Sequence, residues 1–570
     1  MVSASTALLE ALTEAGVSYV FANFGSDHPA IVEAFAEAKV KGRRVPSLIT
    51  CPNEMVALSA AHGFAQASGQ AQCVLVHVEC GTQAMAGAVH NAAKGRIPVL
   101  IFAGTSPFTQ EGELKGSRNE FIHWLQDVAD QRGLVRGYVK YDNEIRSGRN
   151  LKQLVHRAMQ FASSDPKGPV YLMAAREVLE EEVPSVPVDP ADWQPIAPAA
   201  LPPERVAELA EDLARAKRPL VVTSYLGRNP AAVPELQRLA NRLGMAVQES
   251  APSYVNIPAD DQLYQGNRWS DRGQNRVLAE ADLVLVLDSD VPWIPTVSKP
   301  RKDARIYHID VDPLKERTPL WYIPARRVFR ADSLTALRQL NRHLDDMAID
   351  EGAVAERRRH YAALHQARLK ELRELEVPRG DIITGEVLTA CLRRRVKDDT
   401  IVLNEGITHY RTIIDHLGIT RPGSAMTSGA TSLGWSGGGA IGVKLACPDK
   451  FVMSLTGDGS YMFSVPSSVH WIARQYKTPF LQVIYNNRGW KAPKLSALAV
   501  HPEGHASRAN EIGVTFDPPP DYAAIAAAAG GAHAQTVRRA AELEAAVAQA
   551  VEVVRNEQRC AVLDVWLPHL

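Results

Sequence analysis

Two polar segments in the last third of the sequence, Gly457-Asp458-Gly459-Ser460 and Asn486-Asn487, each follow an apolar run. The glycines would let backbone N–H groups approach a phosphate, and the carboxylate of Asp458 is a hard oxygen ligand for a divalent cation. Asn487 would add an amide oxygen and Gly489 a backbone carbonyl. Magnesium usually completes its shell of about six oxygens with water and substrate phosphates. The pair of segments therefore predicts a magnesium–diphosphate site, although GDG by itself is also a common turn.

The apolar segments around these residues indicate how a fold would position them. In every third of the chain, short runs rich in Val, Ile and Leu alternate with helical stretches, as in CVLVHV, ADLVLVLD and KFVMSLTGDG. Such unalternating runs are typical of parallel strands that helices cover on both faces. We therefore predict an α/β protein with three doubly wound domains and mostly parallel sheets. Ligands of such sheets bind beyond the carboxyl ends of the strands, which is where GDGS and NNRGW fall.

The length of 570 residues is too great for one core and suits three or more domains. Seven prolines between Pro184 and Pro203 favour an extended linker. A second boundary is expected after the charged helical stretch that ends near Gly380. We predict domains at 1–183, 203–345 and 378–570.

Composition restricts the classes of partner and compartment. The formal net charge is −1, from 63 basic and 64 acidic residues that are interspersed, so bulk electrostatics indicate no nucleic-acid or membrane partner. No run approaches the ~20 apolar residues of a membrane span, and the first residues resemble an amphipathic helix rather than a signal peptide. The six cysteines form no CxxC pair, which fits a reduced, cytoplasmic protein. We expect a small-molecule substrate.

The spacing of GDG and NN, together with the three-domain layout, resembles the thiamine diphosphate enzymes of the acetolactate synthase, benzoylformate decarboxylase and pyruvate decarboxylase superfamily, over essentially the whole chain. The resemblance implies thiamine diphosphate and Mg²⁺ as cofactors. It also implies a pyrimidine-binding, a central and a diphosphate-binding domain, in that order. The expected assembly is a homodimer or homotetramer with active sites at the dimer interface, where Glu54 of one chain meets Asp458 and Asn487 of another.

The same resemblance assigns residues to the cofactor. In CPNEMVALSAAHGFAQASG, it identifies Glu54 as the acid that exchanges a proton with the pyrimidine; a surface glutamate on a helix is the alternative. In GATSLGWSGGG, Leu433 would lie beneath the bent cofactor and the Thr431 carbonyl would accept its amino hydrogen, the alternative being a helix entry that only packs closely. Residues with backbone or hydroxyl groups near the diphosphate would be Gly406, Ile407, Thr408, Gly457, Gly459 and Ser460. Glu405 would point toward the reacting centre.

Candidate substrate-binding residues also come from the resemblance. HVECGTQAMAGAVHNA and NFGSDHPAIVEAF are similar to benzoylformate decarboxylase segments, which implies that His77 donates or accepts a proton and that Ser26 donates a hydrogen bond to a carboxylate. Histidine suits proton exchange near neutral pH, although a satisfied core histidine is the alternative. Gln126 in NEFIHWLQD stands where acetolactate synthase and benzaldehyde lyase carry a glutamine. His123 has no assigned role.

These residues predict an enzyme that makes or breaks the bond beside a carbonyl, as a 2-oxo acid decarboxylase or an acetolactate synthase-like carboligase. The alternatives are a 2-hydroxyacyl-CoA lyase, an FAD-containing relative, and a non-catalytic thiamine diphosphate-binding paralogue. FAD or ADP could bind the central domain, with Asp310 and Asp312 near a ribose. The absence of a GxGxxG motif there favours a purely structural domain.

Overall fold

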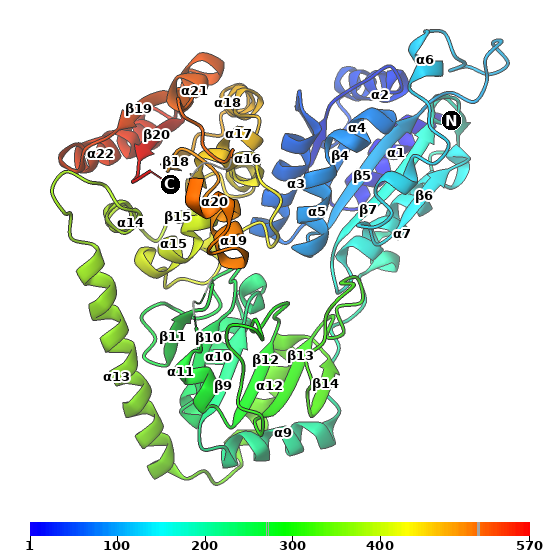
Figure 1. Ribbon diagram of the computed structural model, residues 1–570. Coiled ribbons are helices and arrows are strands. Elements are labelled where there is room, and N and C mark those ends of the chain that lie inside the picture. The colour runs from blue at the N-terminus through cyan, green and yellow to red at the C-terminus, as the bar shows by residue number, and fades with distance from the viewer. Residues whose placement is uncertain (270, 272, 510–512, 570) are drawn as a thin grey trace.

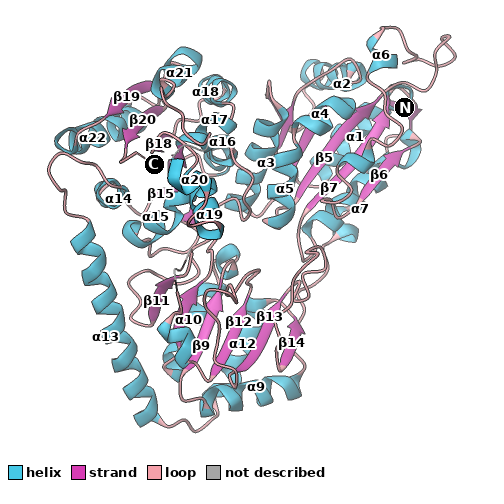
Figure 2. Cartoon of the chain, viewed as in Figure 1, coloured by secondary structure: helices cyan, strands magenta, loops and turns pink. Residues whose placement is uncertain are grey.

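The computed structural model describes residues 1–269, 271, 273–509 and 513–569, and it contains three parallel sheets of six strands each (Figures 1 and 2). Helices lie on both faces of the sheets, which confirms the predicted α/β architecture. Figure 1 shows the N-terminal sheet at the right, the central sheet at the bottom and the C-terminal sheet at the upper left.

The N-terminal sheet has the order β3-β2-β4-β5-β7-β6, all parallel. Helices α1, α2 and α7 pack on one face, and α3 and α5 on the other. The strands are β2 Tyr19–Ala22, β3 Ser47–Thr50, β4 Gln72–Val76, β5 Val99–Thr105, β6 Asp142–Ile145 and β7 Pro169–Ala175. The main helices are α1 Ala4–Glu14, α2 Pro29–Val40, α3 Glu54–Ser68, α5 Ala86–Lys94 and α7 Leu151–Ser163.

The central sheet has the order β11-β10-β9-β12-β13-β14 and is also parallel. Its strands are β9 Pro219–Thr223, β10 Ala246–Glu249, β11 Tyr264–Asn267, β12 Leu283–Leu287, β13 Arg305–Asp310 and β14 Arg327–Arg330. Its helices are α9 Pro203–Arg215, α10 Ala232–Leu243, α11 Arg276–Glu280 and α12 Ser333–Asp345. The long helix α13 (Glu351–Leu375) runs along the edge of the molecule from the central to the C-terminal domain (Figure 1).

The C-terminal sheet has the order β16-β15-β17-β18-β20-β19. Its strands are β15 Thr400–Glu405, β16 Ala425–Met426, β17 Phe451–Gly457, β18 Leu481–Asn486, β19 His533–Val537 and β20 Ala561–Trp566. Its helices are α14 Gly385–Arg393, α15 Tyr410–Leu417, α16 Trp435–Ala446, α17 Asp458–Phe463, α18 Pro466–Gln475, α19 Lys491–Val500, α20 His505–Ala509, α21 Tyr522–Gly530 and α22 Ala540–Asn556. Every residue of β15 and β18 is buried, as expected for strands covered on both faces.

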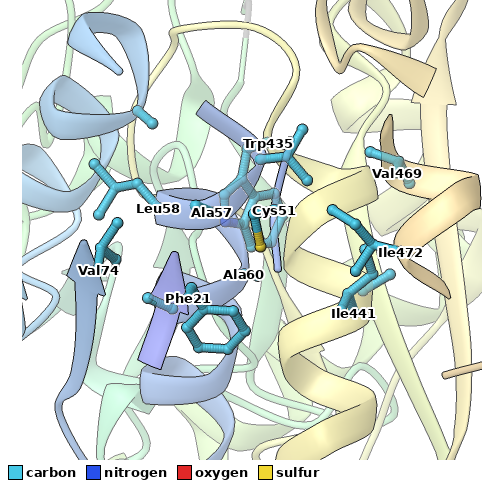
Figure 3. Close-up of a cluster of buried hydrophobic side chains, with 14 of the residues drawn as sticks. Phe21, Cys51, Ala57, Leu58, Ala60, Val74, Trp435, Ile441, Val469 and Ile472 are labelled. Atoms are coloured by element: carbon cyan, nitrogen blue, oxygen red, sulfur yellow. The ribbon is translucent and has the colours of Figure 1, made fainter. Parts of the chain in front are cut away.

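The N-terminal and C-terminal domains share a core because α3 packs along α16 (Figure 3). Small residues bring the two backbones together: a Cβ on Gly63 would lie 2.2 Å from the Gly439 carbonyl oxygen, and one on Gly442 only 1.9 Å from that of Ala60. The two helices begin at the same end of the pair, where Met55 lies beside Gly434. This contact places the segment that carries Glu54 next to the loop that carries Leu433.

Each sheet lies within one of the residue ranges predicted for the domains. We propose that the chain divides at those boundaries, with the proline-rich segment 184–202 and the helix α13 as the connections. Within the part of the chain that the structure describes, no helix has the length and apolar character needed to cross a membrane.

Candidate active site

The carboxyl ends of three neighbouring strands in the C-terminal sheet collect the residues of the predicted magnesium–diphosphate site. Strand β17 lies between β15 and β18, with Glu405 opposite Thr456 and Gly457 opposite Tyr485. Asp458 therefore follows β17 directly, between the ends of its two neighbours. The parallel sheet brings together segments that are far apart in the sequence, as predicted.

Asp458 is a buried carboxylate whose fixed partners are backbone N–H groups. Its Oδ1 accepts from Gly459 and its Oδ2 from Gly489, both at 2.9 Å. Burial raises the pKa of this carboxyl to about 6, although the backbone donors act to lower it. A divalent cation at the carboxylate would favour the ionised form.

Two further oxygens at this edge are buried without a hydrogen-bond partner among the described residues, Asn487 Oδ1 and Ser460 Oγ. Unpaired buried oxygens are uncommon and call for an explanation such as a missing ion or ligand. The neighbouring Asn486 differs, because its amide donates to Asp564 and accepts from the Arg488 N–H. The donor set of Asp458, Asn487 and Ser460 thus fits a hard cation and phosphate oxygens.

The loop after β15 leads through a short 3₁₀ turn into α15. The Gly406 N–H already donates to Asn404 Oδ1 at 3.0 Å. Ile407 has a φ of +47°, a strained conformation for a β-branched residue that is concentrated at functional sites. Ile407 and Thr408 belong to a 3₁₀ turn, Ile407–His409. The contribution of this loop to a diphosphate site stays a prediction.

Glu405 is held by the backbone at the start of α16, and its position relative to the reacting centre stays a prediction. Its two carboxylate oxygens accept from the N–H groups of Trp435 and Ser436, at 2.9 and 2.8 Å. Burial raises its pKa to about 7, although these N–H groups act to lower it. Glu405 therefore caps the N-terminus of α16, where a carboxylate satisfies orphan backbone donors.

The loop that carries Thr431 and Leu433 is fastened to the N-terminal domain. The Asn91 side chain accepts from the Ser432 N–H at 3.0 Å and donates to the Ser432 carbonyl at 2.8 Å. Leu433 is half-buried and Thr431 is exposed. Asn91 thus holds the backbone between the two residues that were predicted to contact the cofactor.

The second group of candidate residues lies at the carboxyl edge of the N-terminal sheet. Glu54 is the first residue of α3, whose N-cap Asn53 accepts from the Val56 N–H. The carboxyl of Glu54 is buried, and its Oε1 accepts from Asn23 Nδ2 at 2.8 Å. A buried, singly held carboxyl contradicts the alternative of a solvated surface glutamate.

His77 follows β4 and directly precedes α4 (Val78–Ala84), and its ring joins residues from two other segments. Nε2 lies 2.8 Å from Gln126 Oε1, and Nδ1 lies 2.5 Å from Asp27 Oδ1. The hydrogen bond to Asp27 raises the pKa of His77, while burial acts to lower it. Ser26 Oγ is buried with no partner among the described residues. The structure therefore brings three of the predicted substrate-binding residues to one edge.

His123 has a structural explanation. The Arg176 guanidinium lies 3.1 Å from its Nε2 and also donates to Asn119, so these residues fasten the loop that leads to Gln126. Burial, together with the charge of Arg176, lowers the pKa of His123.

Comparison with protein-family models matches all three domains. The model "Thiamine pyrophosphate enzyme, N-terminal TPP binding domain" matches residues 2–134, the central domain of the same enzymes matches 206–318, and the C-terminal TPP binding domain matches 406–565. The chain belongs to the thiamine pyrophosphate enzymes. These models confirm the predicted family and the use of thiamine diphosphate.

Relatives of this thiamine pyrophosphate enzyme are decarboxylases and acetolactate synthases. Benzoylformate decarboxylase of Pseudomonas aeruginosa is 27% identical over 500 residues, 85% of this chain and 86% of the relative. Acetolactate synthase isozyme 3 large subunit of Escherichia coli is 23% identical over 574 residues, 98% and 94% of the two chains. Among solved structures, the fold is similar to that of the thiamine diphosphate-dependent 4-hydroxybenzoylformate decarboxylase of Rhodococcus jostii RHA1, with a TM-score of 0.78, 20% identity, and coverage of 100% and 99% of the chains. The chain is thus an enzyme of this kind, and the non-catalytic alternative is not retained.

In this thiamine pyrophosphate enzyme, Asp310 of the central domain was expected to lie near a nucleotide ribose. Its carboxylate instead accepts hydrogen bonds from other groups of the same chain. Asp310 is fully buried, and its Oδ2 accepts from Tyr225 Oη and Lys315 Nζ at 2.5 and 2.6 Å. Its Oδ1 accepts from the Asp312 N–H at 2.8 Å. Because these donors satisfy both oxygens, the geometry of Asp310 gives no support to FAD or ADP binding.

Sequence reasoning missed three residues that organise the site: Asp27, Asn23 and Asn91. Asp27 directly follows the predicted Ser26, so the acid in the FGSDH segment could have been recognised from the sequence as a candidate site residue. Asn23 and Asn91 lie in the quoted segments NFGSDHPAIVEAF and HVECGTQAMAGAVHNA. The sequence does not show which group either one bonds, because each contacts its partner only after distant segments pack together.

Proposed function

We propose that this enzyme uses thiamine diphosphate and Mg²⁺ to break or form the C–C bond beside the carbonyl of a 2-oxo acid, as a decarboxylase or an acetolactate synthase-like carboligase. The observation that carries the proposal is the set of oxygens around the buried Asp458, in which Asn487 Oδ1 and Ser460 Oγ have no partner among the described residues. In this proposal, the set is one half of a cofactor site.

Each half of the site has a distinct task in the proposal. Asp458, Asn487 and the Gly489 carbonyl would hold the cation. The Ser460 hydroxyl would bind the diphosphate, which Gly457 and Gly459 would allow to approach the backbone. Leu433 would lie beneath the cofactor, the Thr431 carbonyl would accept its amino hydrogen, and Glu54 would exchange a proton with its pyrimidine. When bound, thiamine diphosphate supplies the carbon nucleophile and takes up the electron pair that C–C cleavage releases.

The N-terminal edge suits the carboxylate and oxygen of a 2-oxo acid. Ser26 offers a hydroxyl donor that no other described residue uses. His77, whose pKa the hydrogen bond to Asp27 raises, offers a proton near neutral pH. Gln126 holds the histidine nitrogen from which that proton would leave.

The direct test follows carbon dioxide and aldehyde from a panel of 2-oxo acids, acyloins and 2-hydroxyacyl-CoA esters. We expect release of carbon dioxide from at least one 2-oxo acid, dependent on both thiamine diphosphate and Mg²⁺. Protein dialysed against a chelator is the control, and adding back Mg²⁺ should restore turnover. Turnover of acyl-CoA esters alone would contradict the proposal and favour the lyase alternative.

We also propose that two copies of the chain assemble as a homodimer, alone or within a homotetramer, and share their active sites. Exposed apolar side chains lie near both halves of the site, Phe121 and Leu125 on one side and Met462 and Phe463 on the other. Among the described residues, no hydrogen bond or ion pair joins Glu54 to Asp458 or Asn487. Met55 nevertheless contacts Gly434 of the same chain, so a site within one chain is the competing arrangement.

Complementation distinguishes these arrangements. Glu54→Gln and Asp458→Asn are each expected to be inactive alone. If sites are shared, each mixed dimer contains one site with both residues intact and one with neither, so mixed dimers isolated through both tags should have about one half of wild-type activity. Sites built within single chains would leave the mixture inactive. Activity is measured after the two variants are co-expressed and purified through different tags.

A further inference from the structure

Asp27 is a buried carboxylate in the candidate active site to which neither the motifs nor the comparisons assign a role. It follows Ser26 and is only 1% exposed. Its Oδ1 lies 2.5 Å from His77 Nδ1, and its Oδ2 accepts from the Val78 N–H at 3.1 Å. The carboxylate thus contacts both the ring and the backbone that follows it.

Two glycines make room for this pair. A Cβ on Gly104 of β5 would lie 1.9 Å from Asp27 Oδ2, and a Cβ on Gly25 would lie 2.0 Å from His77 Nδ1. Real Cβ atoms do not approach so closely, so any side chain at either position would displace the carboxylate or the ring. The contact between Asp27 and His77 is therefore built into the backbone on two sides.

The other nitrogen of His77 faces the open side of the site. Nε2 lies 2.8 Å from Gln126 Oε1, and the Gln126 amide nitrogen lies 3.7 Å from the exposed Cys80 Sγ. The side chain of His77 is 17% exposed, against 1% for that of Asp27. Asp27, His77 and Gln126 thus form a hydrogen-bonded chain from the interior to the surface. The Asp27 carboxylate and the Gln126 amide oxygen are both acceptors, so each requires a proton on the ring nitrogen that faces it.

We infer that Asp27 is a positioning residue for His77: it fixes the ring and retains the Nδ1 proton, so that the Nε2–H points to Gln126 and the substrate. This inference rests on the proposed function, in which His77 exchanges a proton with a 2-oxo acid. When the proton moves from Nε2 to the substrate, the Nδ1–H stays hydrogen-bonded to Asp27 and the ring becomes neutral. A carboxylate in this place stabilises the imidazolium and selects one tautomer of the neutral ring.

The titratable groups around His77 predict the sign of the pH effect. They are Asp27 and His28 from the loop between β2 and α2, and Glu79 from α4, whose charge also acts to raise the pKa of His77. The Asp27 hydrogen bond acts to raise the pKa of His77 and burial acts to lower it, while burial lowers the pKa of His28. Without the carboxylate, burial remains, so the His77 pKa should fall and the protonated fraction at neutral pH should decrease.

The test compares wild-type protein with Asp27→Asn, which keeps the shape and removes the charge. Histidine ¹⁵N NMR of the full chain without substrate, with the His77 signal assigned through His77→Gln, should show its pKa lowered by about 1–3 units in the variant. In steady-state assays of the variant, kcat should fall by about 10²-fold with a smaller change in KM. In its pH–rate profile, the fall in rate caused by deprotonation of His77 should occur at a lower pH than in the wild type.

Gly104→Ala is a second variant that leaves Asp27 in the sequence and displaces its carboxylate. We expect the pKa of His77 to fall in this variant as well. Gly137→Ala is the matched control, because a Cβ there meets no atom within 4 Å and its titration and activity should equal those of the wild type.

An unchanged His77 titration in both Asp27→Asn and Gly104→Ala would overturn the inference, as would a shifted titration with an unchanged pH–rate profile. The NMR experiment needs no turnover. A wild-type enzyme with no activity on any 2-oxo acid would therefore count against the proposed function, whereas an unshifted titration would count against Asp27.

Discussion

Glu54→Gln should keep the binding of thiamine diphosphate and Mg²⁺ and lose nearly all turnover. Glutamine has the same shape and can still accept the hydrogen bond from Asn23, so α3 and its neighbours should remain in place. It cannot exchange a proton, and loss of a general acid or base typically lowers rates by about 10²- to 10⁴-fold. Cofactor binding is measured by calorimetry and turnover by carbon dioxide release.

Glu37→Gln is the control for this prediction. Glu37 lies on α2 of the same domain, is partly exposed, and pairs with Lys41 on the surface of the molecule. Its removal should leave activity unchanged, because an exposed ion pair contributes little. If Glu54→Gln retained wild-type turnover, the assignment of Glu54 would be refuted. Weak cofactor binding in that variant would instead assign it a role in affinity.

Asp458→Asn should lose the Mg²⁺-dependent binding of thiamine diphosphate. The substitution removes the only charge among Asp458, Asn487 and Ser460. It also replaces one of the two carboxylate oxygens, which accept from Gly459 and Gly489, with an NH₂ group that only donates. Mutation of a residue that only supports a metal ligand typically lowers metal affinity by about 10- to 100-fold, so loss of a direct ligand should lower it by at least about 100-fold. Calorimetric titration with and without Mg²⁺ measures the effect.

Asp449→Asn, an exposed acid between α16 and β17, is the control and should bind as the wild type does. Cofactor affinity that depends on Mg²⁺ equally in Asp458→Asn and the wild type would contradict the proposed metal site. Asp458 also accepts hydrogen bonds from the backbone of Gly459 and Gly489, so its substitution could destabilise the fold. The melting temperature of the variant is therefore measured together with its cofactor affinity.

The two halves of the site differ in how much their side chains are already satisfied. In the C-terminal half, Asn487 and Ser460 have oxygens without a partner among the described residues, which the proposed ion and phosphate would satisfy. In the N-terminal half, Asp27 and Gln126 are both bonded to His77, and Ser26 Oγ is one of the buried atoms without a partner among the described residues. We interpret the first half as the cofactor side and the second as the substrate side.

Local patterns in the sequence determined the fold class and predicted the C-terminal half of the candidate site. Apolar runs without alternation specify buried parallel strands, and parallel strands bring their carboxyl ends to one edge. Asp458 and Asn487 therefore could be placed together without coordinates, because each directly follows such a run. The start of α3 at Glu54, capped by Asn53, is likewise a local feature.

The tertiary structure alone decided which polar groups are paired. Glu405 follows a strand as Asp458 does, yet it caps α16, because the chain returns 30 residues later with free N–H groups at that place. Asp27 reaches His77 across 50 residues, and Asn91 reaches Ser432 across 341. Hydrogen bonds act over a few ångströms between segments that only folding brings together, so residue type and spacing leave them undetermined.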